Sequence, residues 1–259
     1  MLINFVNIIF IYIMKIFTIG SCRTCHCFKC HDYPNDFVHT TKEILQLFDL
    51  LSKQNIEYKD RYRLINRNFS NSNRITYEIN RIKNKILTAD IIILEISSIK
   101  IVYNKEDDLY FQFDLYNRVI EQTENLKNNQ QSLKKLYNQS ENIQKNTTIN
   151  NQTETQLKDD LEQIYTYLVC NWNKKMVLIP HINATITKNN IQCKIPNREL
   201  LCKVLKDFSS KKYVSYFNPI DYLDDDYSKI FDNGNNGHYS QSSGEIIKHK
   251  LHTFITEIV

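Results

Sequence analysis

The chain has 259 residues and a mass of 30.9 kDa, which is enough for one large domain with a substantial core. Its 33 basic and 29 acidic residues give a net charge of +4 and are spread along the sequence without a run of like charge. This distribution argues against a nucleic-acid-binding protein, which usually carries a basic patch or arm.

The chain opens with an apolar segment, residues 1–13, that continues into the first predicted strand. A membrane anchor over residues 1–19 is one interpretation, but no basic segment precedes it and no small-residue cleavage site follows it. A membrane helix would also consume that strand. We therefore expect an apolar N-terminal extension followed by a domain that starts at Met14, with no membrane association unless residues 1–19 anchor the chain.

The first predicted strand, residues 15–19, ends at Gly20 and Ser21. The chain holds only 4 glycines, so we expect each to lie where a Cβ would clash. Ser21 precedes a predicted short helix, and its hydroxyl can project from the turn where the first helix amides also point. That geometry serves a nucleophile and its oxyanion together. An N-cap is the alternative role for Ser21, and the thiol of Cys22 is a second candidate nucleophile.

Four of the 7 cysteines are closely spaced, at Cys22, Cys25, Cys27 and Cys30. Such a group invites a zinc or iron–sulfur interpretation. A structural zinc site normally pairs two separate turns, however, and this window supplies no second one, so cysteines acting as small apolar helix residues are the favoured reading. We predict no metal, with these four as the alternative ligands. The remaining cysteines have no evident partners, which favours a reducing, cytoplasmic setting.

The next segment carries a helix start signal. Residues 36–39 can form a short second strand, and Thr40 and Glu43 then form a capping-box pattern. Apolar residues at helical spacing continue to about Leu51, so the pattern predicts a helix there. A second helix is predicted at residues 75–87 by the same periodicity.

The clearest strand covers residues 89–98, an apolar run without alternation that is typical of the middle of a parallel sheet. Residues 101–113 alternate apolar and polar side chains and predict a surface hairpin. The segment 121–152 is rich in Asn, Gln, Lys, Ser and Thr and has few large apolar residues. It is expected to be a flexible insertion or a partly helical arm.

The rest of the chain alternates helices and strands. Helical periodicity is present at 155–170, 197–208 and 243–258, and apolar strand-like runs at 175–180 and 213–217. This alternation predicts an α/β fold, a three-layer α/β/α sandwich with a central, mainly parallel sheet of the flavodoxin-like type. Active sites of such sheets lie at the carboxyl ends of the strands. Five polar residues fall there: Ser21, Thr40, Ser97, His181 and Asn183.

A second group of candidate residues lies near the end of the chain. Three of the glycines surround His238, which follows Asp232 by a short loop. The loop can fold the carboxylate onto the imidazole, which orients a general base and stabilises its charged form. Fallback carboxylates are Asp224, Asp225 and Asp226. His39 and His181 are expected to be pocket or core residues, and Arg23 either holds an anionic substrate or lies on a helix surface.

These segments together resemble the SGNH/GDSL-type hydrolases. The resemblance is carried by Ile19-Gly20-Ser21-Cys22-Arg23-Thr24, by the strand at 90–98, and by Asp232, His238-Tyr239-Ser240 and Gly244. The closest similarity is to a branch in giant viruses and bacteria whose first block reads Gly-Ser-Cys. The resemblance implies a three-layer α/β/α fold with Ser21 as acyl acceptor, His238 as base and Asp232 as its orienting carboxylate. Residues 99–152 are unmatched.

The chain departs from the family pattern at the oxyanion hole and at the Asp–His spacing. The family's Asp and His are normally three residues apart, and here they are more widely spaced. No glycine lies between Gly20 and Gly234 to supply the second-block amide, so the amide of Thr40 or Thr41 would replace it. The third block's asparagine is missing as well. Its strand end carries Ser97 and Ser98, and Asn183 lies one strand over.

The sequence thus predicts a serine-dependent ester hydrolase or acyl transferase acting on a small acyl ester, such as an O-acetylated carbohydrate. No metal or organic cofactor is required. One hydrolase domain would span 14–259, with the polar insertion inside it, and the amides of Ser21 and Thr40 with Ser97 or Asn183 would hold the oxyanion. The alternatives are a catalytically degenerate binding protein on the same fold and a metal-binding protein that uses Cys22 to Cys30.

Overall fold

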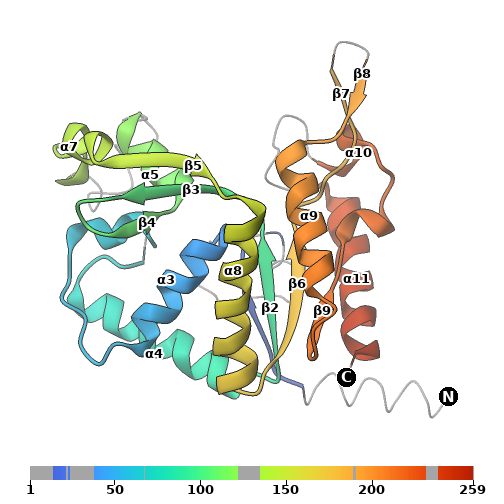
Figure 1. Ribbon diagram of the computed structural model, residues 1–259, viewed down its shortest axis with the longest axis horizontal. Coiled ribbons are helices and arrows are strands. Elements are labelled where there is room, and N and C mark those ends of the chain that lie inside the picture. The colour runs from blue at the N-terminus through green and yellow to red at the C-terminus, as the bar shows by residue number, and fades with distance from the viewer. Residues whose placement is uncertain are drawn as a thin grey trace.

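A sheet of four parallel strands forms the centre of the molecule, in the order β1-β2-β6-β9 (Figure 1). The strands are β1 (Ile16–Ile19), β2 (Ile91–Ile96), β6 (Lys175–Pro180) and β9 (Val214–Tyr216). The computed structural model describes residues 14–21, 23, 38–66, 68–121, 135–188, 191–231 and 239–258. All six residues of β2 are buried, which confirms its predicted place inside the sheet.

Helices cover both faces of this sheet. They are α3 (Thr41–Ser52), α4 (Ser72–Thr88), α8 (Glu154–Tyr165) and α9 (Pro196–Phe208) on one face, and α11 (Gln241–Glu257) on the other. Each lies close to the span that the apolar periodicity predicts. The described chain is therefore the three-layer α/β/α sandwich expected from the alternation of elements.

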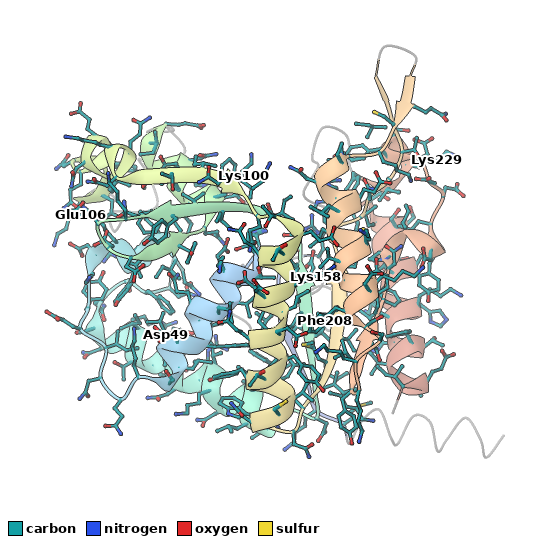
Figure 2. The ribbon with its side chains drawn as sticks, in the orientation of Figure 1. Asp49, Lys100, Glu106, Lys158, Phe208 and Lys229 are labelled. Atoms are coloured by element: carbon teal, nitrogen blue, oxygen red, sulfur yellow. The ribbon has the colours of Figure 1, made fainter. Side chains whose placement is uncertain are left out.

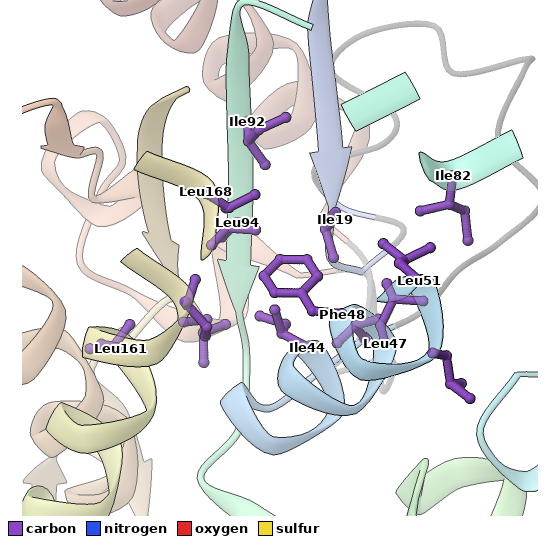
Figure 3. Close-up of a cluster of buried hydrophobic side chains, with 14 of the residues drawn as sticks. Ile19, Ile44, Leu47, Phe48, Leu51, Ile82, Ile92, Leu94, Leu161 and Leu168 are labelled. Atoms are coloured by element: carbon purple, nitrogen blue, oxygen red, sulfur yellow. The ribbon is translucent and has the colours of Figure 1, made fainter. Parts of the chain in front are cut away.

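The two faces divide the side chains of β2 by simple alternation. Ile92 and Leu94 join the larger core with Phe48 of α3 (Figure 3). Ile91 and Ile93 join the smaller core against α11. Glu95 follows on the side of Ile91 and Ile93, so a carboxylate is placed in a strand that is otherwise apolar.

The helix signal at Thr40 and Glu43 is confirmed with one change in its hydrogen bonds. The Thr40 side chain accepts from the Glu43 amide at 3.2 Å, as an N-cap does. The Glu43 carboxyl accepts from the His39 N–H at 3.0 Å, where a capping box would use the N–H of the cap itself. Val38 and His39 form no strand, because the His39 carbonyl accepts from the amides of Ser97 and Ser98 instead of joining a ladder.

A small antiparallel sheet, in the order β4-β3-β5, follows β2. It consists of β3 (Lys100–Asn104), β4 (Leu109–Phe111) and β5 (Thr147–Asn151), with α5 (Phe113–Ile120) and α7 (Ser140–Lys145) beside it. The β3–β4 hairpin is the predicted one. Strand β5 and α7 lie in the polar segment expected to be a flexible or partly helical arm. Composition hides β5 because an edge strand needs backbone pairing with β3 and little apolar surface.

A second hairpin, unpredicted, follows β6. It pairs β7 (Ile186–Lys188) with β8 (Ile191–Cys193). Short elements complete the described chain: η1 (Asp60–Leu64), the π-helical η3 (Thr166–Asn171), η4 (Pro219–Tyr222) and α10 (Tyr227–Ile230). The small sheet and the β7–β8 hairpin both extend from carboxyl ends of central strands and rise at the same end of the molecule (Figure 1). No helix in the described ranges is both long and apolar enough to cross a membrane.

Candidate active site

Ser21 lies at the carboxyl end of β1 and is 2% exposed. Its hydroxyl donates to Oε2 of Glu95 at 2.6 Å, and its backbone N–H donates to the same oxygen at 3.0 Å. Gly20 makes this approach possible, since a Cβ at that position would lie 2.5 Å from the Glu95 Cβ. The expectation that Gly20 occupies a place closed to a side chain is therefore confirmed.

Arg23 completes a buried charged group with Glu95. Its Nε donates to Glu95 Oε1 at 2.9 Å, and the two side chains are only 5% and 2% exposed. The Arg23 backbone N–H also donates to the Ser21 hydroxyl oxygen at 3.3 Å. Of the two roles left open for Arg23, a surface helix residue is excluded by this burial. A buried ion pair is costly to break, because the remaining charge stays out of water.

His181 follows β6, which lies on the other side of β2 from β1, and it supports Arg23. Arg23 Nη1 donates to His181 Nε2 at 3.0 Å, and His181 Nδ1 lies 3.1 Å from the carbonyl oxygen of Ile182. A guanidinium can only donate, so Nε2 is the acceptor and Nδ1 carries the proton. Burial, followed by the charge of Arg23, holds the pKa of His181 well below its usual range. The neutral imidazole therefore positions Arg23 and is not available as a base at Nε2.

A serine and a histidine meet at the end of β2. His39 Nδ1 lies 2.7 Å from the Ser97 hydroxyl oxygen, and the Ser97 amide donates to the His39 carbonyl at 2.9 Å. Burial lowers the pKa of His39, with the charges of Asp114, Arg23 and Glu95 as smaller influences. His39 and Ser97 thus belong to the same electrostatic group as Arg23 and Glu95.

Glu43 is a buried carboxyl beside this group. It accepts from the His39 N–H at 3.0 Å and from the Thr40 hydroxyl at 3.1 Å. Burial raises the pKa of Glu43 to about 8. The group is therefore mostly protonated at neutral pH, and it adds little charge to the site.

Several residues expected in the oxyanion hole or pocket are engaged with neighbouring segments. The Thr41 hydroxyl donates to Asp160 of α8 at 2.7 Å. Asn183 Oδ1 accepts from the Ile195 amide at 3.0 Å, and the Ser98 hydroxyl accepts from the Lys100 amide at 2.9 Å. The amide of Ser21, an expected oxyanion donor, donates to Glu95 instead. A buried carboxylate is a strong acceptor, which explains why it takes both donors of Ser21.

The candidate base and the cysteine group lie outside the described residues. These are Asp232 and His238, and Cys22, Cys25, Cys27 and Cys30. The residues flanking 232–238 are placed, because Phe231 and Tyr239 form an antiparallel bridge. The Phe231 ring centroid is 6.1 Å from that of His181. Both ends of this segment thus lie beside the site. In the described ranges no three His, Cys, Asp or Glu side chains gather as a metal site would.

Sequence reasoning missed Glu95 and Glu43 as members of the site. A signal for Glu95 was present, since it is the one charged residue in the run Ile91–Ile96. A carboxylate in a fully buried strand needs a buried partner. Glu43 was read only as a capping residue, and its burial depends on how α3 packs.

Comparison with known proteins gives one family. The family model described as the TviD N-terminal domain matches residues 14–253. Neither the curated proteins nor the solved structures contain a match to the chain.

Proposed function

The chain belongs to the TviD N-terminal domain family, and from this premise we propose that it is a serine-dependent acyl transferase or ester hydrolase. The family name suggests acetyl transfer in polysaccharide modification, so the proposed substrate is a small acyl ester on a carbohydrate. One observation carries the proposal: the Ser21 hydroxyl lies at the carboxyl end of a central strand, 2.6 Å from a buried carboxylate that is paired with Arg23. Membership of the wider SGNH group remains a prediction.

In the proposed reaction, Ser21 Oγ attacks the ester carbonyl carbon and its proton passes to His238, which Asp232 orients. The tetrahedral intermediate then collapses, the alcohol leaves with that proton, and Ser21 holds the acyl group. A sugar hydroxyl or water completes the cycle by attacking the acyl-enzyme. The position of Phe231 beside His181, and its bridge to Tyr239, support the assignment of the base, since Phe231 and Tyr239 adjoin Asp232 and His238 in the chain.

Glu95 and Arg23 act as positioning residues in this proposal. Glu95 accepts both the hydroxyl and the amide of Ser21, which fixes the serine in one orientation. Arg23 pairs with Glu95 at 2.9 Å, so in this proposal the carboxylate orients the serine and general-base chemistry belongs to an imidazole. Because the Ser21 amide donates to Glu95 and the Arg23 amide donates to Ser21 Oγ, the proposed oxyanion donor at this edge of the sheet is the Ser97 hydroxyl.

The same hydrogen bonds favour a second candidate function, a binding protein that lacks catalysis. Ser21 is 2% exposed, and its hydroxyl proton is directed at Glu95. If Glu95 never releases that hydroxyl, the residue is structural and the fold presents only a binding surface.

The two candidates differ in their response to a small fluorophosphonate probe. The acyl-transfer proposal expects wild-type protein to be labelled once, at Ser21, and Ser21→Ala to lose both the label and hydrolysis of p-nitrophenyl acetate by about 10⁴-fold or more. Ser210→Ala, at an exposed serine just after α9, is the matched control and should label normally. No labelling of wild-type protein, or equal labelling of Ser21→Ala, would refute the proposal and leave the binding function.

A further inference from the structure

A cavity of about 600 Å³ lies along the outward side of α3. We call it the α3 groove. Its walls come from α3, the β3–β4 hairpin and the continuous α8–η3 helix. They include Gln46 and Asp49 from α3, Asp108 and Tyr110 from the hairpin, and Gln163 and Tyr167 from α8 and η3. Figure 2 shows the Asp49 side chain on the part of α3 that faces away from the central sheet. The groove takes no part in the chemistry proposed for Ser21.

The aromatic wall of the groove is a cluster of contacting rings. Tyr167 stacks on Phe48, with ring centroids 4.3 Å apart and planes within 10° of parallel, and it contacts Trp172 at 4.8 Å. Tyr167 belongs to the π-helical η3, and such π-turns are rare and often occur at functional sites. Burial raises the pKa of Tyr167 to about 12, so its phenol stays neutral. A fixed ring of this kind offers a flat apolar face beside a hydroxyl.

The polar wall is rich in acceptors and slightly acidic. Asp49 and Asp108 are exposed carboxylates, and each has one oxygen engaged. Lys53 Nζ lies 2.6 Å from Asp49 Oδ2, and Tyr103 donates to Asp108 Oδ1 at 2.8 Å, which leaves the other oxygen of each as an acceptor for a ligand. Lys42, a cation in the described lining, is paired with Asp160 at 2.7 Å. Carboxylates accept hydroxyl protons well, whereas an acidic lining repels phosphates and uronates.

The groove begins where the candidate active site ends. Helix α3 starts at Thr41, directly after His39 and Thr40, and it lines the groove from Lys42 to Ser52, a distance of about 15 Å along the helix. An occupant of the groove therefore lies along a path that leads to the carboxyl ends of the strands. That length suits several units of an extended chain better than a single small molecule.

We propose that the α3 groove binds a neutral sugar chain, stacking one ring on Tyr167 and accepting its hydroxyls at Asp49 and Asp108. The proposal rests on the function proposed above, because it makes the groove the subsite that holds the polymer whose acylated unit reaches Ser21. A sugar ring has an apolar C–H face and a rim of hydroxyls, and the lining of the groove supplies an aromatic ring and carboxylate acceptors.

The chain contains its own reporter, because Trp172 is its single tryptophan and contacts Tyr167. We expect titration of the full chain with chitohexaose or maltohexaose to change the intensity of its tryptophan fluorescence, and the change to saturate as the oligosaccharide concentration rises. The double variant Asp49→Asn/Asp108→Asn should bind at least tenfold more weakly by calorimetry. Tyr167→Ala should do so as well, and the double variant keeps the test valid if loss of the Phe48 stack prevents folding. Tyr77→Ala, at a 57% exposed tyrosine on α4, is the matched control and should bind as wild type.

The outcomes separate this proposal from the catalytic one. Absence of saturable binding for both oligosaccharides, unchanged affinity in the double variant, or tighter binding of polygalacturonate than of chitohexaose would each overturn the groove proposal. Fluorophosphonate labelling of Ser21 should be normal in the double variant, because the groove lies outside the reacting group. Binding without labelling of wild-type protein would instead retain the groove and remove the acyl-transfer function.

Discussion

Adding one methyl group at Gly20 tests the geometry of the site most sharply. In Gly20→Ala the new Cβ would lie 2.5 Å from the Glu95 Cβ and 3.2 Å from the Glu95 Cα and N. Two of these three atoms belong to the backbone of β2, the central buried strand, so they cannot move cheaply. Strand β1 must shift instead, and it carries Ser21 with it.

Overpacking of this kind costs about 1–3 kcal/mol, which for a chain of this size lowers Tm by about 2–12 °C. Gly244→Ala is the matched control. A Cβ there meets only the Tyr239 Cβ at 3.8 Å, an ordinary contact, so the expectation that each glycine lies where a Cβ would clash is wrong at Gly244, which lies inside α11. Alanine should stabilise that helix by about 0.4–1 kcal/mol. The two substitutions are therefore expected to change the free energy of unfolding in opposite directions: Gly20→Ala lowers it and Gly244→Ala raises it.

The assay combines thermal unfolding with the rate of fluorophosphonate labelling at Ser21. We expect Gly20→Ala to unfold at lower temperature and to label at least tenfold more slowly, while Gly244→Ala labels as wild type. If Gly20→Ala is as stable and as reactive as wild type, β1 and β2 do not approach as described, and the reasoning about Gly20 is wrong.

Three further predictions concern charge. Glu95→Gln should lower the free energy of unfolding, measured in urea, by about 3–5 kcal/mol because the Arg23 charge stays buried without its partner; an unchanged value would contradict the burial of that pair. The pKa of Glu43 is raised to about 8 from 4.5, so the folded state binds this proton more tightly than the unfolded state does. The stability gained from the proton is fully present below pH 4.5 and is lost as the pH rises through 8. Glu43→Gln should therefore flatten the fall in Tm between pH 6 and about 9, and an equally steep fall would exclude Glu43 as its source. The pKa of His181 is lowered, so the neutral imidazole contributes stability to the folded state above pH 6.5, and this stability is lost as the pH falls. His181→Gln should therefore reduce the loss of Tm between about pH 7 and 5. An unchanged loss would show that His181 does not titrate as described.

The sheet could be predicted because its evidence is local. An apolar run without alternation placed β2 inside a parallel sheet, and spaced apolar residues located the helices that cover it. The position of Ser21 at a strand end followed from the same local pattern.

The pairing within the site is not local. Glu95 contacts Ser21 and Arg23, more than 70 residues earlier in the chain, and no spacing rule connects them. Thr41 illustrates the opposite error, because a residue at the expected helix start turned out to face Asp160 of α8. Strand β5 was hidden by its polar composition, since its stability comes from backbone pairing with β3.

The most direct test of the account is to trap the acyl-enzyme. Wild-type protein would be mixed with p-nitrophenyl acetate, quenched in acid within the first turnover, digested and analysed by mass spectrometry. The account predicts one added acetyl group on the peptide that contains Ser21, and none on that peptide in Ser21→Ala. An acetyl group found on Cys22 or Ser97 instead, or no acetylated peptide during measurable turnover, would contradict the central claim that Ser21 accepts the acyl group.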